Sequence, residues 1–135
     1  MIKKHILVVD DEPMLRKLYQ ALLVNYGYTS EIAENGEDAW TKLGQADYDG
    51  VLLDYQMQGI NGLTFLQRIK QQYPFLPVLM ITGHTDEQIR SKALKAGARA
   101  CLYKPFACKK FEQVLSRTVG TTPLKAVLSE HVASL

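Results

Sequence analysis

Hydrophobic and polar positions along this chain form two kinds of segment that alternate five times. One kind is a short run dominated by apolar and β-branched residues, as in buried strands, although the second run is half polar. These runs span residues 5–9, 28–33, 50–53, 77–82 and 99–103. The other kind comes after each run and carries apolar residues at helical spacing. Strand and helix in alternation predict an α/β fold, with a five-stranded parallel doubly wound sheet, helices on both faces and right-handed crossovers.

Residues with known capping roles mark the helix boundaries. Pro13 suits the first position of a helix, Asn35 suits the cap of the second helix, and residues 85–88 have the spacing of a capping box. Gly27 and Gly97 stand where the first and fourth helices should end, because glycine readily adopts the conformation needed there.

Composition and charge narrow the class of protein. The 135 residues fit one domain, and 47% hydrophobic with 22% charged residues is typical of a globular protein. A net charge of +2 gives no reason to expect direct binding to nucleic acid or to a membrane surface. Neither a run of about 18 apolar residues nor a signal peptide is present, so the expected location is cytoplasmic, with Cys101 and Cys108 as reduced thiols.

Asp54 ends the apolar run at residues 50–53 and needs a physical reason to be there. An unpaired carboxylate buried at the end of a strand costs several kcal/mol or more. A helix cap or a salt bridge is one explanation, and a metal or phosphoryl site is another. Ligands bind at the carboxyl edge of open α/β sheets, which favours testing the second explanation.

Other polar residues stand at the same predicted edge. Asp10 and Asp11 come directly after the first strand, Thr82 ends the fourth, and Lys104 comes after the fifth. Because parallel strands end on one side of their sheet, these groups can converge on Asp54. Three carboxylates close together repel one another unless a cation joins them, and few protein oxygens plus water suit Mg²⁺. A lysine and a hydroxyl nearby match a phosphoryl group, and a carboxylate nucleophile can form an aspartyl phosphate.

Each residue also has an ordinary explanation. Asp10 and Asp11 alone are better explained as caps of the first helix. Lys104 is explained by a solvated surface charge, and Thr82 by the preference of strands for β-branched residues. Together these explanations require several coincidences at one sheet edge, so the phosphoryl site is favoured.

Four motifs in order give the chain a resemblance to a known family. They are Val8-Val9-Asp10-Asp11-Glu12-Pro13, Leu53-Asp54-Tyr55-Gln56-Met57 with Gly59 and Asn61-Gly62, Ile81-Thr82-Gly83, and Lys104-Pro105-Phe106. With these motifs, residues 5 to about 119 resemble the receiver domain of two-component response regulators. The resemblance implies a flavodoxin-like (βα)5 receiver fold with strand order 2-1-3-4-5.

The resemblance also implies a role for each acid. Asp54 would be the phosphoacceptor. Asp11 would bind Mg²⁺ directly, and Asp10 would hold it mainly through water. Asp54 and the backbone carbonyl of Gln56 would complete the protein ligands of the ion.

The same resemblance implies further roles. Lys104 would pair with Asp54 or its phosphoryl group, and the Lys104-Pro105 peptide bond is expected to be cis. Thr82 would move toward the phosphoryl group and report its presence to the face formed by the fourth helix, fifth strand and fifth helix.

Two positions depart from the pattern of the family. Gln58 stands where the family usually has proline, which should change the stiffness of the loop more than the chemistry. Cys101 stands where the family often has an aromatic switch residue, and Tyr103, which has the same strand parity, is a candidate substitute.

These implications predict a phosphorylation-dependent signalling switch of a two-component system. A phosphohistidine on a sensor histidine kinase or on a histidine phosphotransfer protein would supply the phosphoryl group, and the protein would then present a changed surface to its partners. Self-phosphorylation and self-dephosphorylation would be its only chemistry, so we do not expect an enzyme. The downstream partner would be another protein or an output domain absent from this sequence, and a homodimer is a further alternative.

Three other functions fit less well. A Mg²⁺-dependent phosphohydrolase with an Asp nucleophile would, by family resemblance, need a second acid at residue 56, which is Gln56. A receiver used only as an interaction platform would normally lack an acidic or lysine position, and none is missing here. A flavin or dinucleotide binder would need a glycine-rich phosphate loop after the first strand.

Residues 1–120 form the predicted receiver domain, and residues 121–135 form a tail. Thr122-Pro123 suits a helix start, and the apolar residues after it fall on one face of a short amphipathic helix. This helix could dock on its own domain, make a dimer contact or begin a linker to an output domain. About 15 residues are too few for a DNA-reading helix-turn-helix domain.

Overall fold

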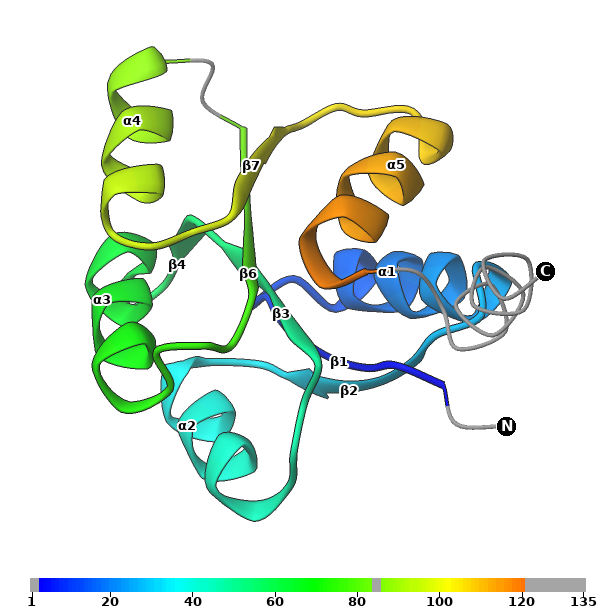
Figure 1. Cartoon of the computed structure of the whole chain (residues 1–135), viewed down its shortest axis with the longest axis horizontal. Coiled ribbons are helices and arrows are strands. Elements are labelled where there is room, and N and C mark those ends of the chain that lie inside the picture. Colours follow the sequence, from blue (N-terminus) through cyan, green and yellow to red (C-terminus); the bar gives the residue numbers. More distant parts are fainter. Residues whose placement is uncertain (1–2, 84–85, 121–135) are drawn as a thin grey trace, which may run out of the picture.

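The computed structural model describes residues 3–83 and 86–120, and its centre is one parallel sheet of five strands (Figure 1). The strands are β1 (His5–Val9), β2 (Thr29–Ala33), β3 (Gly50–Asp54), β6 (Val78–Thr82) and β7 (Ala100–Tyr103). Their order across the sheet is β2-β1-β3-β6-β7, and every neighbouring pair is parallel. This confirms the predicted fold class and the predicted order 2-1-3-4-5, counted over the strands of this sheet.

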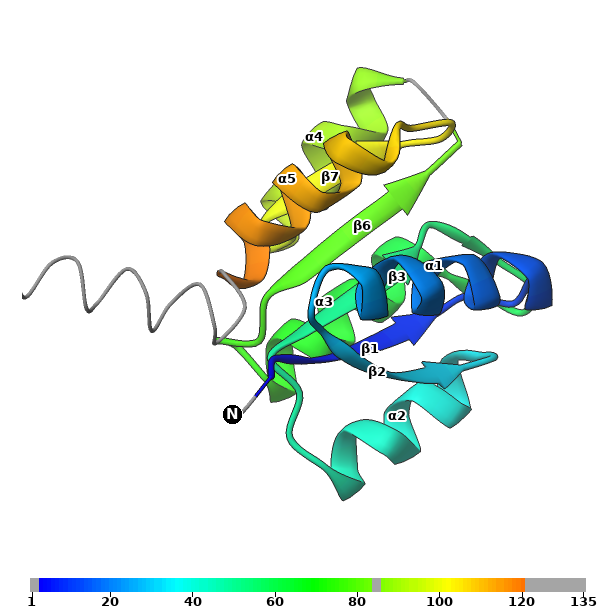
Figure 2. The same ribbon diagram turned by 90° about the vertical axis from the view of Figure 1, so that its right-hand side faces the viewer.

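In the described part of the chain, five helices cover the two faces of the sheet (Figures 1 and 2). They are α1 (Pro13–Asn25), α2 (Gly36–Gln45), α3 (Gly62–Gln72), α4 (Glu87–Lys95) and α5 (Cys108–Val119). Helices α1 and α5 lie on one face, and α2, α3 and α4 lie on the other. The sheet is therefore enclosed on both sides, which explains why its inner strands β3 and β6 are nearly continuous apolar runs.

Alternate residues of each strand divide the core into two clusters. Val51 and Leu53 of β3 pack with α2, α3 and α4, whereas Leu52 packs with α1 and α5. All five residues of β3 are buried, including Asp54 at its end. The strand that carries the candidate nucleophile is therefore the most enclosed part of the sheet, together with β6.

The segment after Asp54 is a small hairpin, and the prediction of a plain loop there was wrong. Strands β4 (Gln56–Met57) and β5 (Ile60–Asn61) pair antiparallel across the two residues Gln58 and Gly59. Gly59 has φ +79°, the left-handed conformation that the third residue of a type II turn requires. The turn of this hairpin thus has glycine at the position where the backbone needs a positive φ.

Most predicted helix boundaries are confirmed. The side chain of Asn35 accepts a hydrogen bond from a backbone N–H at the start of α2, and Asn61 caps the start of α3 in the same way. Gly27 and Gly97 have positive φ after α1 and α4. The start of α4 differs from the prediction, because Asp86 is its N-cap and the helix begins one residue later than a capping box opened by residue 85 would place it.

The second strand begins one residue later than predicted, because the Tyr28 N–H donates a hydrogen bond of 2.8 Å to the Leu23 carbonyl in α1, and pairing with β1 starts at Thr29. The Tyr28 ring packs in the core. The Tyr28 hydroxyl donates a hydrogen bond of 3.2 Å to the carbonyl of Gly120. Gly120 in turn lies against Lys4, just before β1, where an added Cβ atom would be 3.6 Å from Lys4 Nζ. Lys4 and Gly120 thus meet at the amino edge of the sheet. The predicted tail helix lies beyond Gly120, outside the described residues.

In the part of the chain that the structure describes, no helix combines the length and the apolar character needed to cross a bilayer.

Gly62, the first residue of α3, packs closely against the end of β3. A Cβ atom built on Gly62 would lie 2.7 Å from the carbonyl oxygen of Tyr55 and 2.9 Å from that of Asp54. Both are backbone atoms, so they cannot swing aside as a flexible side chain would. The Gly62 amide also donates a hydrogen bond of 3.1 Å to the Tyr55 carbonyl. Any side chain at this position must therefore displace the turn that comes after Asp54.

We expect Gly62→Ala to lower the free energy of unfolding by about 1–3 kcal/mol, because overpacking against backbone forces the chain to shift. Gly44→Ala is the matched control. Gly44 lies in α2 with no atom within 4 Å of an added Cβ, so alanine should raise the stability by about 0.5–1 kcal/mol. Urea denaturation followed by circular dichroism measures both changes. A Gly62→Ala protein as stable as the wild type would contradict the packing argument.

Candidate metal and phosphoryl site

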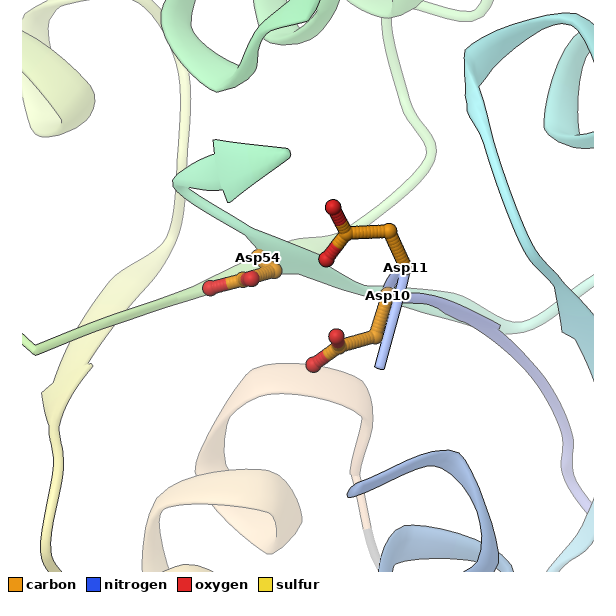
Figure 3. A group of neighbouring side chains, drawn as sticks. All are labelled: Asp10, Asp11 and Asp54. Carbon is orange, nitrogen blue, oxygen red and sulfur yellow. The ribbon is translucent and has the colours of Figure 1, made fainter. Parts of the chain in front are cut away.

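Three carboxylates meet at the carboxyl edge of the sheet (Figure 3). Asp10 comes directly after β1 and Asp54 ends β3, and these strands are neighbours with Val9 opposite Leu53. One oxygen from each of Asp10, Asp11 and Asp54 lies within 4.8 Å of the others. Asp10 and Asp54 are 1% and 6% exposed, whereas Asp11 is half-buried. The parallel topology thus brings together acids that are more than 40 residues apart in the sequence.

Backbone N–H groups hold Asp10 and Asp11 in place. Asp10 Oδ1 accepts a hydrogen bond of 2.9 Å from the N–H of Glu12, while Asp10 Oδ2 is buried with no hydrogen-bond partner among the described residues. Asp11 Oδ2 accepts a hydrogen bond of 2.9 Å from the N–H of Gln58, in the turn of the β4–β5 hairpin. Helix α1 has Glu12 as its N-cap and no side-chain cap hydrogen bond. The two aspartates therefore do not serve as helix caps.

Lys104 forms an ion pair with Asp54. The distance from Lys104 Nζ to Asp54 Oδ1 is 3.2 Å, and the lysine side chain is only 25% exposed. The Lys104 amide donates a hydrogen bond of 2.7 Å to the carbonyl of Thr82, and the Lys104-Pro105 peptide bond is cis, as expected. Lys104 is therefore a partly buried partner of the acidic cluster and not a solvated surface charge.

Thr82 and Gln56 complete the set of predicted site residues. Thr82 ends β6 and is fully buried, and the register of β6 with β3 places Ile81 opposite Asp54. Thr82 thus stands at the same edge, one residue beyond that pair. Gln56 begins β4, and its N–H donates a hydrogen bond to the Asp54 carboxylate.

Burial and mutual repulsion disfavour the charged forms of the carboxylates at this edge. Burial raises the pKa of Asp10 to about 6; the hydrogen bond from Glu12 opposes the rise, and the Asp54 carboxylate adds to it. Burial also raises the pKa of Asp54, although the Lys104 ammonium opposes this. One lysine therefore does not compensate three carboxylates, and an additional cation would favour their charged forms.

The donor atoms suit a hard divalent cation. All three side chains offer carboxylate oxygens, and no cysteine or histidine joins this cluster within residues 3–83 and 86–120. Oxygen-only sites with few protein ligands favour Mg²⁺ over zinc, which prefers nitrogen and sulfur. The unpaired Oδ2 of Asp10 is a further acceptor in this group. The residues present therefore fit a magnesium site.

An open cleft of about 710 Å³ lies beside the acids. The cleft runs between the loop that precedes α1 and the β4–β5 hairpin. Of the three clustered aspartates, Asp11 is the one that lines it. The cleft is lined by Asp11, Glu12, Pro13, Tyr55, Gln56, Met57, Gln58, Ile60 and Asn61. Asp11 thus faces solvent on one side and the buried acids on the other.

The acids can be placed from the ends of the strands, but two contacts at the site cannot be predicted in that way. The Arg16 guanidinium donates a hydrogen bond of 2.9 Å to the Asp10 carbonyl, yet an arginine on a helix surface gives no such signal in the sequence. The contact of Gln58 with Asp11 depends on the hairpin. The sequence contains only a weak signal for that hairpin, the glycine of Gln58-Gly59 between Met57 and Ile60.

Comparison with known proteins places these observations in a family. The family model of the response regulator receiver domain matches residues 6–116. An NtrX-like response regulator of Rickettsia conorii is 36% identical over 127 residues, which cover 93% of this chain and 27% of that protein. The DNA-binding transcriptional regulator NtrC of Salmonella typhimurium is 34% identical over 113 residues, which cover 84% of this chain and 24% of that protein. The chain thus spans 27% or less of the length of these two relatives.

A solved structure shows the same fold at nearly the same length. The chemotaxis protein CheY4 of Vibrio cholerae superposes with a TM-score of 0.82 at 29% sequence identity, and the match covers 87% of this chain and 99% of that one. The family match, the order of the strands and the acidic sheet edge agree with one another. This chain belongs to the family of response regulator receiver domains, which act as phosphorylation-dependent switches in two-component signalling.

Proposed function

We propose that Asp54 is the phosphoacceptor of this receiver domain. Its carboxylate ends the central strand, pairs with Lys104 at 3.2 Å and lies with Asp10 and Asp11 in a group of oxygens within 4.8 Å. This grouping is the observation that carries the proposal. A carboxylate nucleophile with a cation site and an ammonium beside it has the components that phosphoryl transfer uses.

Mg²⁺ is the proposed cofactor. Asp11 and Asp54 would bind the ion directly, and Asp10 would hold it mainly through water. The backbone carbonyl of Gln56 would complete the protein ligands. When bound, the ion supplies positive charge that neutralises phosphoryl oxygens. The oxygen-only donor set and the raised pKa values of Asp10 and Asp54 support this assignment.

In the proposed transfer, an oxygen of Asp54 attacks the phosphorus of a phosphohistidine. The new O–P bond forms as the N–P bond breaks, and the imidazole leaves with the bonding electron pair. Lys104 Nζ, which already stands beside Asp54, stabilises the charge on the phosphoryl oxygens, and Thr82 is the proposed hydroxyl donor. Asp54 itself is the only group modified, so we propose no enzymatic activity beyond its own phosphorylation and dephosphorylation.

The proposed signal passes from Thr82 to the face formed by α4, β7 and α5. Tyr103 stands opposite Thr82 in the register of β7 with β6, and its hydroxyl lies 3.5 Å from Glu87 Oε1 in α4. Cys101 is half-buried on the same strand, two residues earlier. Because a cysteine cannot fill the volume of an aromatic ring, we propose that Tyr103 takes over the aromatic part of the switch.

The proposed phosphodonor is a sensor histidine kinase or a histidine phosphotransfer protein in the cytoplasm. The relatives differ in how much of their own length the receiver occupies. NtrC is a DNA-binding regulator of which the match covers 24%, whereas CheY4 is matched over almost its whole length. The proposed output is therefore either a separate downstream protein or a further domain of a longer chain, and a homodimer is a third proposal for the partner.

We propose residues 1–120 as the receiver domain and residues 121–135 as a tail outside it. The family match ends at residue 116 and α5 ends at Val119, which supports a boundary near Gly120.

Incubation with MgCl₂ and acetyl phosphate should add the mass of one phosphoryl group to the protein, because a small phosphodonor can use the same nucleophile and cation site. Asp54→Asn, or EDTA in place of MgCl₂, should abolish the gain in an intact-mass measurement. Asp47→Asn is the control, since Asp47 is exposed and lies outside the cluster. A wild-type protein that gains no mass and binds no beryllofluoride would favour the interaction-platform alternative.

Asp10→Asn should stabilise the metal-free protein at alkaline pH. Since the folded-state pKa of Asp10 is raised from 3.8 to about 6, its contribution to stability is present below pH 3.8 and is lost as the pH rises through 6. In EDTA at pH 8, the variant should therefore exceed the wild type by about 1–3 kcal/mol, and the two should converge toward pH 4.

Urea denaturation at several pH values measures this difference. Asp47→Asn, which removes an exposed carboxylate, should follow the wild type across the series. A constant difference between Asp10→Asn and the wild type from pH 4 to 8 would show that burial of this charge does not destabilise the fold.

Gln58→Pro should weaken Mg²⁺ binding relative to Gln58→Ala. Proline removes the N–H that holds Asp11, whereas alanine keeps it, and loss of a hydrogen bond worth about 1 kcal/mol corresponds to about fivefold in affinity. The hairpin should persist, because proline is favoured before the glycine of a type II turn. An NMR titration with MgCl₂ compares the two variants. Equal affinities would mean that the hairpin does not orient Asp11.

A further inference from the structure

Tyr19 is a buried polar side chain on α1, the helix that begins just after two of the three acids. It is 2% exposed, and its hydroxyl has no hydrogen-bond partner among the residues that the structure describes. Buried tyrosine hydroxyls nearly always have a partner, because an unpaired one loses its bonds to water without replacement. The position of this hydroxyl therefore needs an explanation.

Asp10 Oδ2 is the other buried side-chain oxygen without a partner within residues 3–83 and 86–120. A carboxylate oxygen can only accept a hydrogen bond when it is charged, whereas a tyrosine hydroxyl can donate one. The two unpaired atoms are thus chemically complementary. No direct hydrogen bond joins them, and one water molecule placed between them would satisfy both.

Both side chains lie on the same side of the sheet. Asp10 continues the alternation of Val8, whose side chain packs in the cluster that contains Tyr19. Figure 3 shows the Asp10 carboxylate directed away from Asp11, toward the side on which α1 and α5 lie. The charges around Tyr19 are consistent with this placement. Burial is the main cause of the raised pKa of the Tyr19 hydroxyl, and the Asp10 and Asp54 carboxylates add to it.

A stack of three aromatic rings fixes the orientation of Tyr19. Its ring centroid lies 6.2 Å from that of Phe106 and 5.9 Å from that of Phe111, and the latter two are 5.6 Å apart. The three rings are within 16° of parallel. Phe106 stands two residues after Lys104, so the stack connects α1 and α5 to the loop that carries the lysine. A ring held in this way presents its hydroxyl in one direction.

We propose that Tyr19 is a positioning residue for Asp10, with its hydroxyl donating a hydrogen bond to one buried water molecule that in turn donates to Asp10 Oδ2. The bridge satisfies both oxygens and fixes the carboxylate in one orientation. Groups that orient a carboxylate in this way strengthen metal binding at the site it serves. The inference rests on the proposed function, in which Asp10 holds Mg²⁺ mainly through water.

Tyr19→Phe removes the hydroxyl and keeps the aromatic stack. In metal-free buffer we expect a lower midpoint of urea denaturation, because the variant loses the bridge to Asp10. A hydroxyl that is buried and unpaired predicts the opposite sign, since its removal would raise the midpoint. In an NMR titration with MgCl₂ we expect about tenfold weaker binding. In a phosphorylation assay with acetyl phosphate, saturating MgCl₂ should restore the wild-type rate.

Tyr28→Phe is the matched control. Tyr28 is also buried, but its hydroxyl donates to the Gly120 carbonyl at 3.2 Å, at the amino edge of the sheet. Its loss should lower the denaturation midpoint and leave Mg²⁺ affinity unchanged. A double-mutant cycle tests the connection to Asp10. In the Asp10→Asn background, Tyr19→Phe should have little further effect on Mg²⁺ binding.

The outcomes separate this inference from the proposed function. A wild-type protein that binds no Mg²⁺ would overturn the proposed metal site and the role of Tyr19 with it. Normal binding by the wild type, together with an unchanged affinity or a raised denaturation midpoint in Tyr19→Phe, would overturn the role of Tyr19 alone. Equal losses of Mg²⁺ affinity in Tyr19→Phe with and without Asp10→Asn would also overturn it, because they would show that the hydroxyl acts independently of Asp10.

Discussion

Burial of like charge at one end of the sheet is the constraint on which the rest of this structure depends. Asp10 and Asp54 are almost completely removed from solvent, and burial raises the pKa of each. A chain free to rearrange would separate such groups or expose them. The parallel sheet prevents this, because the strands that carry the acids are fixed as neighbours by backbone hydrogen bonds and by an apolar cluster on each face. Stability from the core thus holds these acids together in an electrostatically unfavourable arrangement.

Much of this arrangement can be predicted from the sequence because it depends on periodicity and topology. Continuous apolar runs indicate strands covered on both faces, and parallel strands must end at one edge, so Asp10, Asp54 and Lys104 can be placed together before any coordinates are known. The β4–β5 hairpin is harder to predict, because it depends on four strand residues and one glycine. Such short pairing is stabilised by its surroundings more than by its own sequence.

The position of Tyr19 shows a different limit of prediction. On a helix whose neighbouring positions are apolar, a tyrosine is most simply explained as a core residue, and its ring is indeed part of the core. Whether its hydroxyl finds a partner depends on Phe106 and Phe111, which are more than 85 residues away in the sequence, and on the direction of the Asp10 carboxylate. Whether a buried polar atom has a hydrogen-bond partner depends on how the whole interior packs, so it cannot be predicted from a local sequence pattern.

Lys4 and Gly120 lie together at the amino edge of the sheet, and the five residues of β1 separate that edge from the acids by about 17 Å. A fluorescent dye or an affinity handle attached at either residue would therefore project from the end of the molecule remote from the acidic cluster. Immobilisation on a sensor chip through this edge would leave the cleft beside Asp11 open to the proposed phosphodonor. It would also keep the α4–β7–α5 face (Figure 1) free for measuring how a partner's affinity responds to the proposed modification of Asp54.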